Sequence, residues 1–99
     1  VHYEDLVRRK SGGKSEILQG REIDSVTGDA LIQVKRSLTA VDKPHNFLGK
    51  STRNQIKGTI RMANDQGKRA EFWFKYGVHP QVRKYIESKD GKVKTGLGE

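Results

Sequence analysis

Residues 21–36, REIDSVTGDALIQVKR, have the pattern of two short strands joined by a tight turn at residues 27–29. Asp24 ends the first strand, and the second strand carries Gln33 and Lys35, two positions apart. Because strand side chains alternate between faces, Gln33 and Lys35 lie on the same face, while the apolar residues beside them point into a core. The stretch therefore gathers a carboxylate, an amide oxygen and an ammonium group at one place.

Such a gathering suits a metal-dependent phosphodiesterase. That chemistry needs oxygen ligands for a hard cation, and a positive charge near the attacking water and the scissile phosphate. Taken singly, Asp24 is more often a turn-starting residue, and Gln33 and Lys35 are more often solvated strand residues. Taken together, two polar residues inside the most hydrophobic strand of a chain with a lean core favour a functional site.

The composition limits the size of the core and suggests the kind of partner. The chain has 99 residues, which suits one small domain, and its hydrophobic and charged fractions are both 32%. Its 20 Lys and Arg residues against 12 Asp and Glu residues give a formal net charge of +8. This balance predicts a polyanionic partner, either nucleic acid or an acidic protein.

Cysteine and histidine usage excludes several kinds of metal site. The chain contains no cysteine, which excludes disulfides and thiolate zinc sites. His2, His45 and His79 are far apart in the sequence, so a metal site built from histidines is not expected. No apolar run approaches the length of a membrane span. The chain starts at Val1 rather than methionine, and we expect residues 1–99 to be one domain of a much longer protein.

Apolar spacing and turn residues predict the order of elements. The expected elements are a helix over residues 3–10, strand pieces at 17–18 and 22–24, a strand over 30–37, a loop at 42–46, a helix over 50–66, a strand over 70–76, a helix over 80–88 and a strand over 92–97. Ser51 or Thr52 can cap the longest helix, and Pro80 suits the first position of the last one. Asp90-Gly91 is typical of a hairpin turn. The order predicts an α/β domain with a small mixed sheet flanked by helices.

Four basic residues recur at near-helical spacing along the longest predicted helix, on a different face from its apolar residues. They are Lys50, Arg53, Lys57 and Arg61. A solvated helix face is the common reason for such a run. Because no acidic residue balances this one, we expect it to bind backbone phosphates. Gln55 on the same helix is either a further site residue or, more often in such a place, a surface amide.

Aromatic residues crowd the predicted strand over 70–76. They are Phe72, Trp73, Phe74 and Tyr76. Aromatic side chains on a strand can stack on nucleic-acid bases. However, a small domain with few apolar residues needs them for its core, and Phe72 and Phe74 share one face by alternation. The core role is therefore the favoured interpretation, while Trp73 and Tyr76 are either exposed or packed under the last helix.

Residues 22–24, EID, followed by a turn and residues 31–35, LIQVK, resemble the signature of the PD-(D/E)XK, or restriction-endonuclease-like, nuclease superfamily. That signature places an Asp at one strand end and an acidic residue two positions before a Lys on the next strand. Within the superfamily, the chain is similar to the restriction-endonuclease-fold toxin domains at the C-termini of contact-dependent growth-inhibition (CdiA-type) and other polymorphic toxins. The supporting residues are 20–24, GREID, and 31–37, LIQVKRS. The resemblance extends through the basic helix and the aromatic strand, so it covers most of the chain.

The resemblance implies a role for each residue of the pattern. Asp24 matches the metal-binding Asp, Gln33 stands where Asp or Glu is usual, and Lys35 matches the lysine. The neutral amide of Gln33 offers a carbonyl ligand without a negative charge, so the affinity for a metal ion should fall.

Many members of the superfamily add a Glu from the helix before the first strand. Glu4, on the helix predicted over residues 3–10, is the best match for it. Weaker candidates are Glu16 and Glu22. Glu22 shares the strand parity of Asp24 and can face the same site.

The implied reaction is metal-assisted hydrolysis of a phosphodiester bond in nucleic acid. Glu4, Asp24 and the side-chain oxygen of Gln33 would hold a divalent metal ion, and Mg²⁺ suits a set of oxygen ligands. Lys35 would orient or deprotonate the attacking water and offset the charge that builds on the phosphate. RNA such as tRNA is slightly preferred over DNA, because a small domain with one site suits single-strand cleavage of a compact RNA.

The resemblance also implies a setting and a partner. A large effector, secreted or exposed on the cell surface, would deliver the domain to the cytoplasm of a competing bacterium. A cognate immunity protein would neutralise the toxin in the cell that makes it, and an acidic one suits a domain of charge +8. Two other functions stay open. One is a non-enzymatic nucleic-acid-binding module, and the other is a metal-independent ribonuclease that uses His45 and His79 as acid and base.

Overall fold

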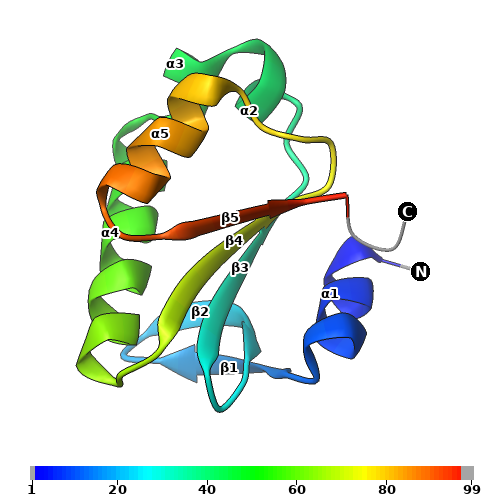
Figure 1. Cartoon of the computed structure of the whole chain (residues 1–99), viewed down its shortest axis with the longest axis vertical. Coiled ribbons are helices and arrows are strands. Elements are labelled where there is room, and N and C mark those ends of the chain that lie inside the picture. The colour runs from blue at the N-terminus through cyan, green and yellow to red at the C-terminus, as the bar shows by residue number, and fades with distance from the viewer. Residues whose placement is uncertain (1, 97–99) are drawn as a thin grey trace.

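The computed structural model of the chain describes residues 2–96. A five-stranded sheet with the strand order β1-β2-β3-β4-β5 runs through it (Figure 1). The strands are β1 (Lys14–Leu18), β2 (Arg21–Val26), β3 (Ala30–Lys35), β4 (Arg69–Phe74) and β5 (Lys92–Thr95). The helices are α1 (Tyr3–Ser11), α2 (Thr39–Asp42), α3 (Pro44–Phe47), α4 (Lys50–Asp65) and α5 (Pro80–Ser88).

The sheet combines an antiparallel half and a parallel half. β1, β2 and β3 are antiparallel neighbours, whereas β3, β4 and β5 pair in parallel. Parallel neighbours need a crossover connection, which α4 supplies between β3 and β4, and α5 supplies between β4 and β5. α1 covers one face of the sheet, and α4 and α5 cover the other (Figure 1). The predicted α/β domain with a small mixed sheet flanked by helices is confirmed.

Two apolar clusters hold these layers together. The larger one lies between the sheet and α4 and α5, and it includes Leu31, Ile56 and Phe72. The smaller one lies under α1 and includes Val7 and Ile32. β3 is therefore covered on both faces, because successive residues of the strand enter different clusters. The face of β3 that was predicted to be polar is therefore covered along part of its length and not open to solvent throughout.

The predicted helices over 3–10, 50–66 and 80–88 are present as α1, α4 and α5. α5 begins at Pro80, as expected. The expected cap of α4 is wrong, since Gly49 is its N-cap residue and no described side chain, Ser51 and Thr52 included, caps it. The first turn of α4 also lacks an acidic residue. The positive end of this helix is thus left without a negative side chain of its own.

Residues 42–46 are not the loop that the sequence predicts. Asp42 ends the one-turn helix α2, and after Lys43 the one-turn helix α3 begins at Pro44. Burial of Ala40 and Phe47 holds these short helices in place, because such turns are marginal without tertiary packing. Among residues 2–96, no helix is both long enough and apolar enough to cross a membrane.

Asp90 and Gly91 do not form a hairpin turn either. Asp90 has a left-handed φ of 75°, and the N–H of Gly91 donates to Ile86 O over 2.9 Å, so the pair ends α5. β5 then runs parallel to β4, as far as Thr95. Leu97, in the predicted strand over 92–97, lies outside the described residues.

Candidate active site

An irregularity in β2 aims the side chain of Asp24. Lys14 pairs with Val26 and Glu16 pairs with Ile23, so two steps along β1 match three steps along β2. This is a β-bulge with the extra residue on β2, next to Asp24. A bulge bends its strand and changes the direction of the side chains that follow. Sequence alternation alone does not predict this change.

β2 separates from β3 at the same point. The two strands pair only at Ser25 with Ile32 and at Val26 with Leu31. Beyond these pairs, side chains take the place of the missing ladder bonds. The N–H of Val34 donates to Asp24 Oδ2 over 2.8 Å.

Gln33 makes a second tie across the separated strands. Its Nε2 donates to Glu22 O over 3.1 Å and to Thr59 Oγ1 over 3.2 Å. The side chain of Gln33 is 1% exposed. The amide therefore bridges β2, β3 and α4 inside the protein.

The surroundings of the Asp24 carboxyl group disfavour its ionised form. Burial raises its pKa above the usual range, and the hydrogen bond from Val34 and the charge of Lys35 oppose that rise. The negative charges of Glu22 and Glu4 raise the pKa further. Lys35 thus compensates only part of the cost of ionising Asp24, and a bound cation would stabilise the ionised form further.

Lys35 lies two positions after Gln33 on β3 and is half-buried. Burial lowers the pKa of Lys35, and the charge of Asp24 opposes that effect. Its Nζ donates a hydrogen bond to Gln55 Oε1, which projects from α4. Gln55 is therefore a contact of the candidate catalytic lysine, and not a plain surface amide.

Asp24 and the predicted Glu4 line one cavity of about 400 Å³, called here the acidic cavity. Its lining residues are His2, Glu4, Asp5, Arg8, Glu22, Asp24 and Arg36. Glu22, a weaker candidate from the sequence, thus joins Asp24, whereas Glu16 lies exposed on β1. Glu4 Oε2 is 3.3 Å from Arg36 Nε. Gln33 is not in this lining, so the structure does not bring all three predicted metal ligands to one cavity.

The donor chemistry of the acidic cavity fits a hard cation, because its ligands are oxygens. Within residues 2–96, however, no group of three Asp, Glu, His or Cys side chains is placed to hold a metal ion. Mg²⁺ is commonly held by one or two carboxylates together with substrate phosphates and water. Asp24 and either Glu4 or Glu22 suit that incomplete arrangement.

Lys35 lines a different and larger cavity of about 790 Å³, called here the basic cavity. Its lining residues are Arg21, Lys35, Lys50, Ser51, Thr52, Asn54 and Gln55. No carboxylate is among them, so the cavity suits an anion. Asp24 Oδ2 accepts the N–H of Val34, the residue before Lys35, and Asp24 and Lys35 influence each other's pKa. The acidic and basic cavities are therefore neighbours at this pair.

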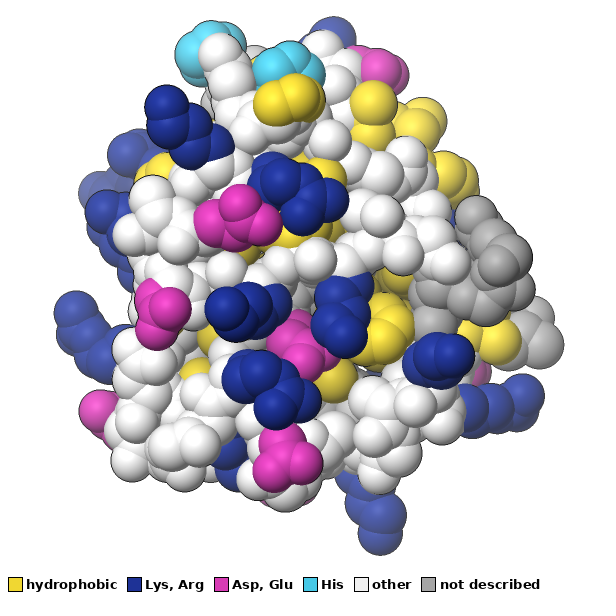
Figure 2. Space-filling view, viewed as in Figure 1, with side chains coloured by type: hydrophobic (Ala, Val, Ile, Leu, Met, Phe, Trp, Pro, Cys, Tyr) yellow, Lys and Arg dark blue, Asp and Glu magenta, His cyan; other side chains and the backbone are white. Residues whose placement is uncertain are grey.

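The predicted basic stripe of α4 is divided between different surroundings. Lys50 lines the basic cavity, Lys57 and Arg61 line another hollow beside Lys89, and Arg53 is exposed. On the face that carries β5, Lys and Arg side chains alternate with Asp and Glu (Figure 2). The positive charge without acidic neighbours therefore lies in the basic cavity rather than on that face.

Sequence reasoning missed Arg21 as a residue of this site. Its side chain lines the basic cavity and reaches the middle of α4, where Gly58 leaves space for it. The sequence does contain a signal, because a glycine inside a strongly patterned helix needs a packing or functional reason.

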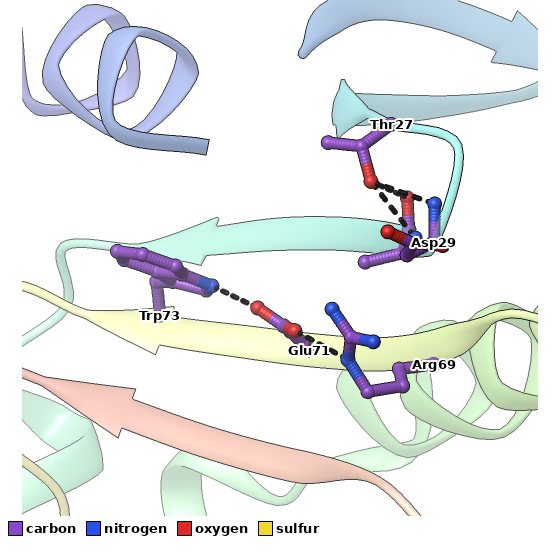
Figure 3. A network of polar contacts seen from close by, with 6 residues as sticks. Thr27, Asp29, Arg69, Glu71 and Trp73 are labelled. Carbon is purple, nitrogen blue, oxygen red and sulfur yellow. Dashed lines mark hydrogen bonds and ion pairs between the residues drawn. The ribbon is translucent and has the colours of Figure 1, made fainter. Parts of the chain in front are cut away.

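Phe72 and Phe74 of β4 fill the core, as predicted, and Trp73 is buried too, whereas Tyr76 lies beyond the end of β4 and is exposed. Phe72 and Phe74 lie in the larger cluster, and Trp73 lies in the smaller one. Glu71 accepts hydrogen bonds from Trp73 Nε1 over 2.9 Å and from Arg69 Nε over 3.0 Å (Figure 3). This buried network ties Trp73 to the sheet and leaves its ring unsuited to base stacking.

His79 has a structural contact at the start of α5. Its Nδ1 accepts the N–H of Gln81 over 3.0 Å, so the imidazole caps the helix. His45 lies exposed in α3. An acid–base pair formed by these two residues gains no support from this geometry.

A family model described as restriction endonuclease fold toxin 3 matches residues 1–98. Among curated proteins and among solved structures, none matches the chain. The family match covers α1, the bulged strand pair, α4 and the rest of the sheet, which together build the two cavities. The resemblance of residues 21–36 to restriction-endonuclease-like nucleases is thus confirmed across the whole domain. By that coverage, the chain belongs to the family of restriction endonuclease fold toxins, which indicates a nuclease toxin with nucleic acid as its substrate.

Proposed function

We propose that the domain hydrolyses phosphodiester bonds at the boundary between the acidic and basic cavities, with the help of a divalent metal ion. The observation that carries this proposal is the placement of Asp24 beside Lys35. Each alters the pKa of the other, and each lines a cavity of opposite charge. One side of the boundary suits a cation, and the other suits the phosphate groups of a strand.

Asp24 and Glu4 are the residues that we propose to hold the metal ion, with Glu22 as a further carboxylate on the same cavity. A bound Mg²⁺ would polarise the scissile phosphate and make a bound water more acidic. Glu4 would have to exchange its contact with Arg36 for the ion. Gln33 would join as a ligand only if its amide turned away from Glu22 O and Thr59.

Lys35 has two uses in this reaction. Its lowered pKa brings the amine nearer to the neutral form, which can take a proton from the attacking water. In the ammonium form it offsets the charge that develops on the phosphate. Gln55 holds Nζ in place for either role.

Nucleic acid is the substrate, and we propose RNA such as tRNA ahead of DNA. The basic cavity and the exposed stripe of α4 would contact backbone phosphates, which positions a strand without reading its sequence. The domain would act in the cytoplasm of a target bacterium after delivery as part of a large secreted or surface-exposed effector, as in contact-dependent growth inhibition. An acidic immunity protein would protect the producing cell.

A non-enzymatic nucleic-acid-binding module is the second candidate function. Two observations favour it: no three carboxylate or imidazole side chains in residues 2–96 form a metal-binding group, and Gln33 replaces an acid. The basic cavity would serve such a module equally well. A cleavage assay separates the two functions.

The test is incubation of the purified domain with total tRNA and with plasmid, in Mg²⁺ and in EDTA. The nuclease proposal expects cleavage in Mg²⁺, none in EDTA, and none by Lys35→Ala. Lys84→Ala, an exposed lysine of α5, is the matched control and should cleave like the parent. Full cleavage in EDTA would exclude the metal-dependent reaction. Binding without cleavage in every condition would favour the binding module.

A further inference from the structure

Helix α4 contains a glycine in its interior, which is unfavourable in a helix relative to alanine. A Cβ added to Gly58 would lie 2.4 Å from Arg21 Nη2 and 2.7 Å from Arg21 Cζ. Those distances are shorter than any normal contact. The guanidinium of Arg21 therefore lies against the helix in space that only glycine leaves.

Arg21 lines a small hollow of about 180 Å³ together with Gly58 and Asp65, and it also lies in the wall of the basic cavity. Lys35 and Lys50 line the same cavity, and no carboxylate does. Among the residues described, 2–96, neither Arg21 nor Lys50 takes part in an ion pair within 4.0 Å. A planar guanidinium with free N–H donors matches the oxygens of a phosphate group in a bidentate contact.

We propose that Arg21, held in place over Gly58, and Lys50 bind a backbone phosphate of the nucleic-acid strand next to the phosphate at Lys35. This inference rests on the proposed function for the position of the scissile phosphate. Because Lys35 also lines the basic cavity, a strand with one phosphate at Lys35 can place the neighbouring phosphate in that cavity. Arg21 is thus a binding residue, and Gly58 is a positioning residue that acts through it.

The experiment measures binding apart from cleavage. A fluorescein-labelled single-stranded RNA 12-mer is titrated in EDTA at several KCl concentrations, and fluorescence anisotropy gives the observed binding constant. Arg21→Ala should weaken binding and make the slope of log K against log[KCl] shallower by about 0.7, the value for one lost single-strand phosphate contact. Gly58→Ala should do the same without changing the net charge, because the new methyl group displaces the guanidinium. The matched controls are Arg83→Ala, at an arginine that pairs with Glu87 on α5, and Gly28→Ala, at a turn glycine with open space around it. Both should keep the parent slope.

A double-mutant cycle tests whether Gly58 acts through Arg21. In the Arg21→Ala background, Gly58→Ala should produce no further change in the slope. An unchanged slope in Arg21→Ala would overturn the phosphate contact. A parent-like slope in Gly58→Ala, with folding verified by circular dichroism, would overturn the positioning role. If Gly58→Ala fails to fold, Arg21→Lys tests the proposal instead. This variant keeps the charge but loses the guanidinium fork, so it should bind RNA several-fold more weakly. Binding with the parent's affinity would overturn the proposal.

These readouts separate this inference from the proposed function. Cleavage of tRNA by the parent in Mg²⁺ tests the nuclease, while the slopes in EDTA test Arg21. A parent that cleaves RNA, together with an Arg21→Ala variant of unchanged slope, leaves the nuclease standing and removes Arg21 from the site. If the parent never cleaves and both variants have a shallower slope, the nuclease proposal is refuted and the phosphate contact of Arg21 is supported.

Discussion

The N–H of Val34 on β3 donates a hydrogen bond to Asp24 Oδ2 on β2, over 2.8 Å, where the two strands no longer pair. The Asp24 carboxylate takes the place of a strand carbonyl there, while burial, Glu22 and Glu4 raise its pKa. A residue that is costly to ionise is thus built into the backbone pairing of the sheet. Substitutions of Asp24 can therefore separate its effect on the stability of the protein from its role in cleavage.

Asp24→Asn should raise the melting temperature at pH 7 and abolish cleavage. Because the folded pKa of Asp24 is raised, its favourable contribution is fully present below the unfolded value of 3.8 and is lost as pH rises through the folded pKa. At pH 7 the ionised group therefore lowers stability, and the neutral amide removes that cost while still accepting from Val34. Thermal unfolding at pH 7 and at pH 3 measures this, and the gain over the parent should vanish at pH 3.

Asp24→Ala is the contrasting variant. It removes the same charge but also leaves the N–H of Val34 without its acceptor, so it should be less stable than Asp24→Asn by about 1–3 kcal/mol of unfolding free energy. Asp42→Asn, an exposed carboxylate of α2, is the control and should change neither stability nor cleavage. A folded Asp24→Ala that cleaves at the parent rate would refute the site.

The activity should rise with pH through the lowered pKa of Lys35. Burial favours the neutral amine, so the fraction able to accept a proton from water grows as pH increases past that pKa and then levels off. Rates measured from pH 5 to 10 in Mg²⁺ should show this limb, and Lys35→Ala should show no cleavage at any pH in this range. Lys35→Arg keeps the positive charge, but arginine does not lose its proton in this pH range, so the variant should be inactive. Recovery of the parent rate in Lys35→Arg would show that only the charge matters.

Gln33→Glu should destabilise the protein in EDTA. A carboxylate cannot donate to Glu22 O, as the Gln33 amide does, and the position is 1% exposed, so the expected cost is about 1–3 kcal/mol. If the new carboxylate reaches the metal ion, addition of Mg²⁺ should recover stability and the affinity for Mg²⁺ should exceed that of the parent. Gln81→Glu, at an exposed position of α5, controls for the added charge. Loss of stability that Mg²⁺ does not reverse would mean that Gln33 is a structural tie and not a ligand.

The basic stripe of α4 should contribute to binding through counterion release. Replacing Arg53 and Lys57 with alanine should make the salt slope for single-stranded RNA shallower by about 0.7 for each lost phosphate contact. Arg83 and Lys84, replaced together on α5, form the matched control pair. An equal slope in the stripe variant and the parent would identify the stripe as ordinary solvated surface.

The domain should be toxic in a bacterial cytosol and should be neutralised by an acidic partner. A net charge of +8 and a cavity lined by Arg21, Lys35 and Lys50 attract an acidic protein quickly, and its binding there would exclude substrate. The measurement is the growth of cells that express the domain alone, the Lys35→Ala variant alone, or the domain together with any small acidic protein encoded next to it. Harmless expression of the folded parent alone would contradict the toxin assignment. Rescue by a partner that leaves the basic cavity open would refute the proposal that the partner covers this cavity, but it would not refute the toxin assignment.

Local patterns in the sequence predicted most of the elements. The spacing of apolar residues located α1, α4 and α5, and the alternation around Gln33 and Lys35 located β3. These signals work because helix and strand periodicity depend on neighbours within a few residues. The two one-turn helices at residues 39–47 were missed, because such short segments form only when the rest of the fold buries them.

The sequence by itself determined the α/β class, the strand–turn–strand pattern of residues 21–36 and the pairing of Asp24 with Lys35 as a candidate site. Only the tertiary structure decided where the polar side chains point. The bulge in β2 aims Asp24 at β3, α4 supplies Thr59 to Gln33 and Gln55 to Lys35, and Arg21 reaches across to Gly58. Each of these contacts joins residues that are far apart along the chain or depends on a one-residue shift in strand register. Neither feature leaves a periodic signal in the sequence, because both follow from how whole elements pack against one another.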